Sequence, residues 1–174
     1  MNISRAIAVA ALMICALPAQ AQAPIDVCFR PGPVACDDMI VKEILSAKIS
    51  VLVQAYRFTN KEIAAALIAA KKRKVDVRVI MDAGQRSEKY SSLDFLVHSG
   101  IPTMIADTPG GLQHNKVIVI DDKSVITGSY NFTKSAETRN AENMLIIRDQ
   151  ATIAKYRANW INQWNTSMPY ARRN

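Results

Sequence analysis

One segment near the middle of the chain carries side chains that could act on a phosphodiester. It has the pattern H-x-K-x4-D-x6-G-S-x-N, formed by His114, Lys116, Asp121, Gly128, Ser129 and Asn131. The pattern combines a potential nucleophile, a fixed positive charge and two neutral hydrogen-bond donors. These groups suit an anionic ester, because the cation and the donors can bind phosphate oxygens while an imidazole attacks phosphorus.

The chemistry of phosphodiester cleavage suggests a role for each group. Lys116 can neutralise the non-bridging oxygens, and Ser129 and Asn131 can hydrogen-bond to them. A neutral His114 can attack phosphorus and form a covalent phosphohistidine, after which an acid must protonate the departing oxygen. A histidine can serve as nucleophile or as acid, depending on its protonation.

The chain contains two histidines, and the second, His98, has Gly100 where the lysine would be. His98 is expected in the last turn of a helix, where it can complement the helix dipole. One chain therefore offers one nucleophile. A twofold dimer that brings two copies of His114 together would supply both the nucleophile and the acid. Glu142, at the start of a later strand, is the best carboxylate to hold the imidazole tautomer.

Asp121 is expected to have a structural role. Side chains alternate between the faces of a strand, so His114 and Lys116 point one way and Asp121 the other. We therefore expect Asp121 to bind the backbone or a cation. No metal and no cofactor are expected, because one motif histidine and an oxidised cysteine pair leave no three-ligand zinc set. Carboxylates could hold magnesium, but the lysine, serine and asparagine already supply what that metal would.

Alternating helix and strand patterns surround the motif. Short apolar runs or period-two alternation predict strands, and amphipathic segments predict helices. The expected strands are 50–56, 75–81, 103–105, 116–121, 125–128 and 142–147, and the expected helices are 37–48, 59–72, 91–99 and a last helix from 150. Thr59-x-x-Glu62 and Ser91-x-x-Asp94 are typical of capping boxes. The order predicts an α/β sandwich with a mixed sheet, because the two motif strands form a hairpin.

The first residues have the features of a targeting signal. Arg5 precedes a short apolar run that ends at Leu17, and cleavage after Ala21 or Ala23 fits a small-x-small site. We expect residues 1–23 to be a cleaved signal peptide and the mature protein to be secreted. Residues 24–170 would then form one domain and residues 171–174 a basic tail. An uncleaved anchor is the alternative, although the run is too short to span a membrane.

The net charge of the chain indicates which kinds of molecule it can bind. The formal net charge is +7, and loss of Arg5 lowers it to +6 because no acidic residue precedes Asp26. A basic secreted protein is attracted to nucleic acid, anionic lipid or surface polysaccharide. The basic run 71–74 is interpreted as the last turn of a helix.

Cys28 and Cys36 are expected to form a disulfide in an oxidising compartment, with two reduced thiols as the alternative.

The motif, the segment Gly128-Ser129-Tyr130-Asn131-Phe132-Thr133-Lys134 and the later Glu142-Asn143 resemble the signature of the phospholipase D superfamily. The short length, single motif copy and signal make the chain similar to small bacterial nonspecific endonucleases of that superfamily, which occur in the periplasm or are encoded on conjugative plasmids. The resemblance implies a phospholipase D-like α-β-α sandwich with a central mixed β-sheet. It implies a homodimer with one composite active site and metal-independent cleavage through a phosphohistidine on His114. It also implies phosphate contacts from Lys116, Ser129 and Asn131, with Glu142 supporting His114.

Three functions compete. The first is a secreted nuclease for single- or double-stranded DNA, with RNA as a further candidate, because no base-reading module is visible and few aromatic residues are placed to stack bases. The second is a phospholipase D or phosphatidyl transferase acting on lipid headgroups. The small size and the lack of an interfacial amphipathic segment disfavour it, and no stable membrane association is expected after signal cleavage. The third is a DNA-binding protein without turnover, which the complete set of reactive groups disfavours.

Overall fold

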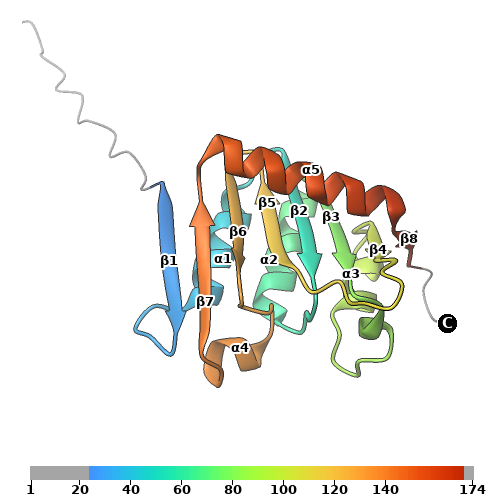
Figure 1. Ribbon diagram of the computed structural model, residues 1–174, viewed down its shortest axis with the longest axis horizontal. Helices are drawn as coiled ribbons and strands as arrows, with labels where there is room; N and C mark the ends of the chain where they lie inside the picture. The colour runs from blue at the N-terminus through green and yellow to red at the C-terminus, as the bar shows by residue number, and fades with distance from the viewer. Residues whose placement is uncertain (1–23, 171–174) are drawn as a thin grey trace, which may run out of the picture.

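The computed structural model describes residues 24–170, so the expected signal peptide (1–23) and basic tail (171–174) lie outside the described residues. Within that range, eight strands form one sheet in the order β1-β7-β6-β5-β2-β3-β4-β8 (Figure 1). The strands are β1 Ile25–Arg30, β2 Ser50–Ala55, β3 Asp76–Met81, β4 Thr103–Ile105, β5 Lys116–Ile120, β6 Ser124–Gly128, β7 Glu142–Ile147 and β8 Met168–Pro169. The helices are α1 Cys36–Ser46, α2 Lys61–Lys72, α3 Leu93–His98, α4 Lys134–Thr138 and α5 Gln150–Thr166, with a 3₁₀ helix at Ala83–Arg86.

The sheet is mixed, as the sequence predicted. β3 is parallel to both β2 and β4, whereas β5 is antiparallel to β2 and forms a hairpin with β6. β7 and β1 extend the antiparallel part to one edge of the sheet. The antiparallel pairing places the start of β5, the end of β6 and the start of β7 at the same end of the strands.

Helices cover both faces of the sheet, which confirms the predicted α-β-α sandwich (Figure 1). α1 and α2 pack over a large core that includes Ile40 and Leu67. α5 packs over a smaller core, in which the Trp160 indole N–H donates to the Val53 carbonyl oxygen at 3.0 Å. Among residues 24–170, no helix is long and apolar enough to cross a membrane.

The two predicted capping boxes are wrong. α2 begins after Asn60, whose side-chain oxygen accepts a hydrogen bond from the Ile63 N–H at 3.0 Å. Asparagine is as good an N-cap as threonine, so the N-cap lies one residue beyond Thr59 and the helix begins at Lys61. The N-cap of α3 makes no side-chain hydrogen bond, and the Ser91 hydroxyl instead accepts from the Leu93 N–H at 3.2 Å.

Cys28 and Cys36 form the predicted disulfide, which joins β1 to the first residue of α1. Within the loop that it closes, the Arg30 guanidinium donates to the carbonyl oxygens of Gly32 and Val34 at 2.7 and 3.1 Å. Arg30 also pairs with Glu142 in the β1–β7 register. The disulfide loop therefore lies at the end of the strands where β7 begins.

Candidate active site

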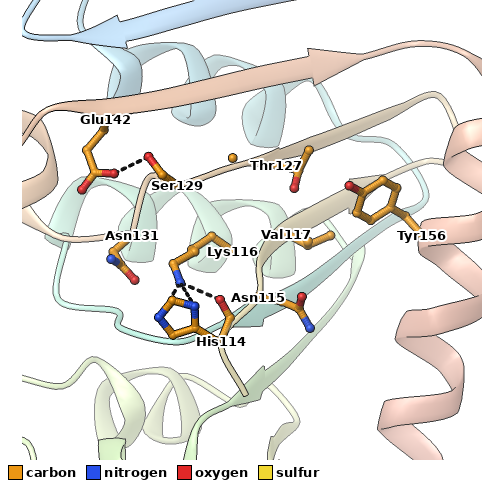
Figure 2. Close-up of a pocket in the computed structure, with 10 residues that line it drawn as sticks. His114, Asn115, Lys116, Val117, Thr127, Ser129, Asn131, Glu142 and Tyr156 are labelled. Carbon is orange, nitrogen blue, oxygen red and sulfur yellow. Dashed lines mark hydrogen bonds between the residues drawn. The ribbon is translucent and has the colours of Figure 1, made fainter. Parts of the chain in front are cut away.

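Most of the motif residues gather at one edge of the sheet, where three strand ends meet (Figure 2). Lys116 is the first residue of β5, Gly128 the last of β6 and Glu142 the first of β7. They border an open pocket of about 330 Å³. Its lining residues are His114, Asn115, Lys116, Val117, Thr127, Gly128, Ser129, Asn131, Glu142 and Tyr156. The structure thus brings together all the predicted catalytic and phosphate-binding residues.

His114 and Lys116 are in contact in this pocket. His114 is exposed, whereas only 6% of Lys116 is exposed. The Lys116 Nζ lies 3.0 Å from Nδ1 and 3.3 Å from Nε2 of His114, and it donates to the His114 carbonyl oxygen at 2.5 Å. A neutral imidazole has one acceptor nitrogen, so only one of the two ring contacts is a hydrogen bond. Burial lowers the pKa of the Lys116 ammonium, and the negative charge of Glu142 partly offsets this effect.

Tyr56 also contacts His114, although the sequence did not identify it as a site residue. The two ring centroids lie 4.4 Å apart, and the Lys116 Nζ lies 4.8 Å from the Tyr56 centroid. The second distance is that of a cation–π interaction. Tyr56 directly follows β2, whose last residue, Ala55, pairs with Lys116. An aromatic residue at the end of an apolar run was the available signal.

The turn after β6 requires a glycine. Gly128 has a φ of +145°, and a Cβ there would lie 2.3 Å from the Asn143 carbonyl oxygen. Ser129 follows, and its hydroxyl accepts from the Asn143 N–H at 3.0 Å and donates to Glu142 at 2.5 Å. A hydroxyl has a single proton, so Ser129 can donate to a phosphate only by turning that proton away from Glu142.

Asn131 has an amide group that is available to a ligand. Its Oδ1 is buried and has no hydrogen-bond partner in the part of the chain that the structure describes. Leaving a buried acceptor unpaired costs free energy, and only a ligand group that donates a hydrogen bond to Oδ1 would recover it. An ionised phosphodiester has no such donor. The Nδ2 end of the same amide can donate to a phosphate oxygen.

Glu142 binds other partners than the sequence suggested. Its carboxylate accepts from the Ser129 hydroxyl and from the Asn140 Nδ2 at 2.9 Å. No hydrogen bond joins it to His114 within residues 24–170, because β6 lies between β7, which begins at Glu142, and β5, which begins two residues after His114. Glu142 is the one carboxylate among the pocket-lining residues. Within the same range, no group of three or more histidine, cysteine, aspartate or glutamate side chains is placed to hold a metal ion.

Asp121 lies at the opposite end of β5, away from the pocket. Its carboxylate accepts the backbone N–H groups of Lys48, Ile49 and Ser50 at 2.7 to 2.8 Å. Partial burial acts to raise the pKa of the Asp121 carboxyl, but the three N–H donors outweigh it and hold the pKa below its usual range. Asp121 therefore ties the turn before β2 to the turn after β5.

A buried polar network supports the 129–131 segment from behind. Tyr130 is 1% exposed, and its hydroxyl donates to Glu137 at 2.9 Å. Glu137 also accepts from the Asp37 N–H at 3.3 Å and forms an ion pair with Arg30 at 3.1 Å. Burial and the Glu137 carboxylate raise the pKa of the Tyr130 hydroxyl, which remains a donor. Because Arg30 belongs to the disulfide loop, that loop helps to position Ser129 and Asn131.

Comparison with known proteins gives matches over most of the chain. Residues 40–164 match the family described as cardiolipin synthase, PLD-like domain. The chain is 43% identical over 143 residues to a protein named phospholipase D from Rickettsia prowazekii. The aligned segment covers 82% of this chain and 69% of that protein. It is 27% identical over 130 residues to a mitochondrial cardiolipin hydrolase from Danio rerio, over 75% of this chain and 57% of the relative.

Two solved structures share the fold. The phospholipase D family member Nuc from Salmonella typhimurium has a TM-score of 0.78 at 36% identity, covering 85% of this chain and 98% of Nuc. NucT from Helicobacter pylori has a TM-score of 0.77 at 26% identity, covering 84% and 98%. The fold and the pocket define an α/β enzyme of the phosphodiesterase class. The chain belongs to the phospholipase D superfamily, and the predicted hydrolase function is confirmed at that level.

Proposed function

We propose that the protein is a secreted, periplasmic nuclease that hydrolyses DNA, with RNA as a second substrate, without a metal ion. The observation that carries the proposal is the joint placement of His114, Lys116 and Asn131 in one open pocket. A pocket of about 330 Å³ admits a backbone phosphate but offers no enclosed site for acyl chains. The net charge, +7 for the full sequence and +6 after loss of Arg5, favours a polyanionic substrate. The overlap with nearly all of Nuc and NucT supports assignment to the small-nuclease branch.

The proposed reaction has two displacements at phosphorus. A ring nitrogen of His114 attacks, the bond to the leaving oxygen breaks, and an acid supplies the proton that this oxygen needs. Water then attacks the phosphohistidine, loses its proton to a base and releases His114. An incoming phosphate competes with the His114 ring for the Lys116 ammonium, which now lies 3.0 Å from Nδ1. Drawing Lys116 toward the phosphate frees the nitrogen lone pair for attack.

A homodimer with one composite site is part of the proposal. The pocket of one chain is lined by a single histidine, and its Glu142 carboxylate is engaged by Ser129. His114 of a second copy would therefore act as the acid. Ile25, Val27 and Phe29 on β1 are 49%, 50% and 63% exposed, and they point away from the large core that contains Cys28. This apolar strip offers surface for a second copy to cover.

A phospholipase D or phosphatidyl transferase is the second candidate, because the Rickettsia relatives carry the name phospholipase D. Purified protein and a His114→Ala variant are incubated with supercoiled plasmid DNA and with phosphatidylcholine vesicles. We expect plasmid cleavage by the wild type alone, with DNA binding that weakens steeply between about 0.05 and 0.2 M salt. Choline release as fast as DNA cleavage would reverse the assignment. DNA binding without cleavage of either substrate would indicate a binding protein.

A further inference from the structure

Two further cavities extend from the active-site pocket. A cavity of about 480 Å³ shares Asn131 with the pocket, and a third of about 540 Å³ shares Thr59 and Tyr90 with the second. We call the second and third cavities together the flanking groove. Its lining residues include Tyr56, Arg57, Thr59, Lys61, Tyr90 and Phe95. The groove therefore begins beside the reacting groups and leads away from them.

Aromatic side chains line the groove along its length. Tyr56, at the inner end, contacts the His114 ring. Tyr90 and Phe95, farther out, are 71% and 55% exposed, which is unusual for rings of this size. The sequence did not reveal this arrangement, because the three residues lie on separate segments. Exposed rings beside a phosphate site are suited to stacking nucleic-acid bases.

Positive charges accompany the rings. Arg57 and Lys61 line the groove, and Glu88 is the one acidic residue among the lining side chains. The Lys89 Nζ lies 5.4 Å from the Tyr90 ring centroid. Cations and rings in the same groove suit a strand that carries both phosphates and bases.

The arrangement of polar and apolar side chains along the groove argues against a lipid acyl chain as its ligand. The third cavity is largely apolar, with Ala64, Ala65 and Phe95 among its lining residues. The second cavity, which separates it from the active site, is lined by Arg57, Glu88 and other polar side chains. An acyl chain attached close to the scissile phosphate would have to cross this polar stretch. A nucleotide chain can place phosphates there and bases on the rings beyond.

We propose that the flanking groove binds the nucleotides next to the scissile phosphate and makes single-stranded nucleic acid the preferred substrate. The bases stack on Tyr90 and Phe95, and the phosphates lie near Arg57 and Lys61. In a duplex the base faces are already stacked on each other and cannot reach these rings. The groove is lined by α2 and by Phe95 of α3, on the opposite face of the sheet from α5. The inference rests on the proposed nuclease function.

The test uses the full chain with His114→Ala, so that bound nucleic acid is not cut. Fluorescence anisotropy measures the affinity for a labelled single strand of about 12 nucleotides and for the duplex of the same sequence. Adding Tyr90→Ala or Phe95→Ala is expected to weaken single-strand binding about tenfold each and to leave duplex binding nearly unchanged. Ile49→Ala, which removes a side chain that is 65% exposed outside the groove, is the control for loss of apolar surface. Circular dichroism checks that each variant is folded.

The results separate this inference from the proposed function. Equal loss of single-strand and duplex binding, or no loss in either aromatic variant, would overturn the groove assignment. Weaker binding to phosphatidylglycerol vesicles with unchanged oligonucleotide binding would also overturn it, in favour of lipid. Failure of the proposed function has another signature: the wild type would cleave the small diester bis(p-nitrophenyl) phosphate but no nucleic acid of any form.

Discussion

Replacing Asp121 with asparagine is expected to lower the stability of the protein while leaving the chemical step nearly unchanged. The carboxylate accepts three backbone N–H groups, two at Oδ1 and one, from Lys48, at Oδ2. Asparagine keeps the shape but has only one acceptor oxygen, so its amide nitrogen would face an N–H group. One hydrogen bond is therefore lost outright, and the other two lose the assistance of a negative charge.

The size of the effect follows from these contacts. A hydrogen bond to a charged group contributes about 1.5–3 kcal/mol, and partial exposure of this site places the total loss at about 2 kcal/mol. In a domain of this length that loss lowers Tm by about 6 °C. Asp122→Asn is the matched control, because Asp122 makes an exposed ion pair with Arg157 at 2.9 Å. Exposed pairs contribute little, so this control is expected to change stability by less than about 1 kcal/mol.

The effect of Asp121→Asn depends on pH with a definite sign. The pKa of Asp121 is lowered in the folded protein. A carboxyl of this kind contributes stability that is present above its unfolded pKa and is lost as the pH falls through its folded pKa. The difference in Tm between wild type and variant is therefore full at neutral pH and shrinks below about pH 4.

Thermal unfolding followed by circular dichroism, at neutral and at acidic pH, measures both effects. Plasmid cleavage at a temperature well below both Tm values measures kcat for the same proteins. A hundredfold loss of kcat with an unchanged Tm would refute the reasoning, because Asp121 would then act in the chemistry from the far end of β5.

Three further changes test other parts of the site. The double change Cys28→Ser and Cys36→Ser removes the disulfide and is expected to lower the free energy of unfolding by about 2–3 kcal/mol, because the disulfide no longer restricts the unfolded chain. Chemical denaturation measures this loss, and an unchanged free energy of unfolding would contradict the prediction. Glu142→Gln removes the charge that raises the pKa of Lys116, so the alkaline limb of the kcat/KM profile is expected to move to lower pH, and a limb that stays in place would show that Glu142 does not act on Lys116. Mixing equal amounts of wild-type and His114→Ala chains is expected to reduce the activity of the wild-type chains to about half, because heterodimers lack one histidine; undiminished activity would argue against a composite site.

Elements with a strong local pattern were predictable from the sequence. β5 and β6 lie within one residue of the expected ranges 116–121 and 125–128. β1 was missed although its residues alternate, because Val27 and Phe29 remain exposed and the strand adjoins the expected signal peptide. α4 has five residues and β8 two, which is too short for periodicity to be detected.

In the site, spacing along the chain predicted contacts within a segment but not contacts across the sheet. Two-residue spacing placed His114 and Lys116 on one side, and the structure shows them in contact. The position of Tyr56 beside His114 depends on the pairing of β2 with β5, which no local pattern specifies. The same holds for Glu142, which the order of the strands places beside Ser129.

The most direct test of the proposed mechanism is whether His114 forms a covalent bond to phosphorus without a metal ion. Wild-type and His114→Ala proteins are mixed with phosphate-labelled DNA in excess EDTA and quenched rapidly in alkali, which preserves phosphohistidine. Mass spectrometry of the peptides then locates the label. We expect label on His114 in the wild type and none in the variant. Cleavage that EDTA abolishes, or rapid cleavage by the wild type with no label on His114, would contradict the proposed mechanism.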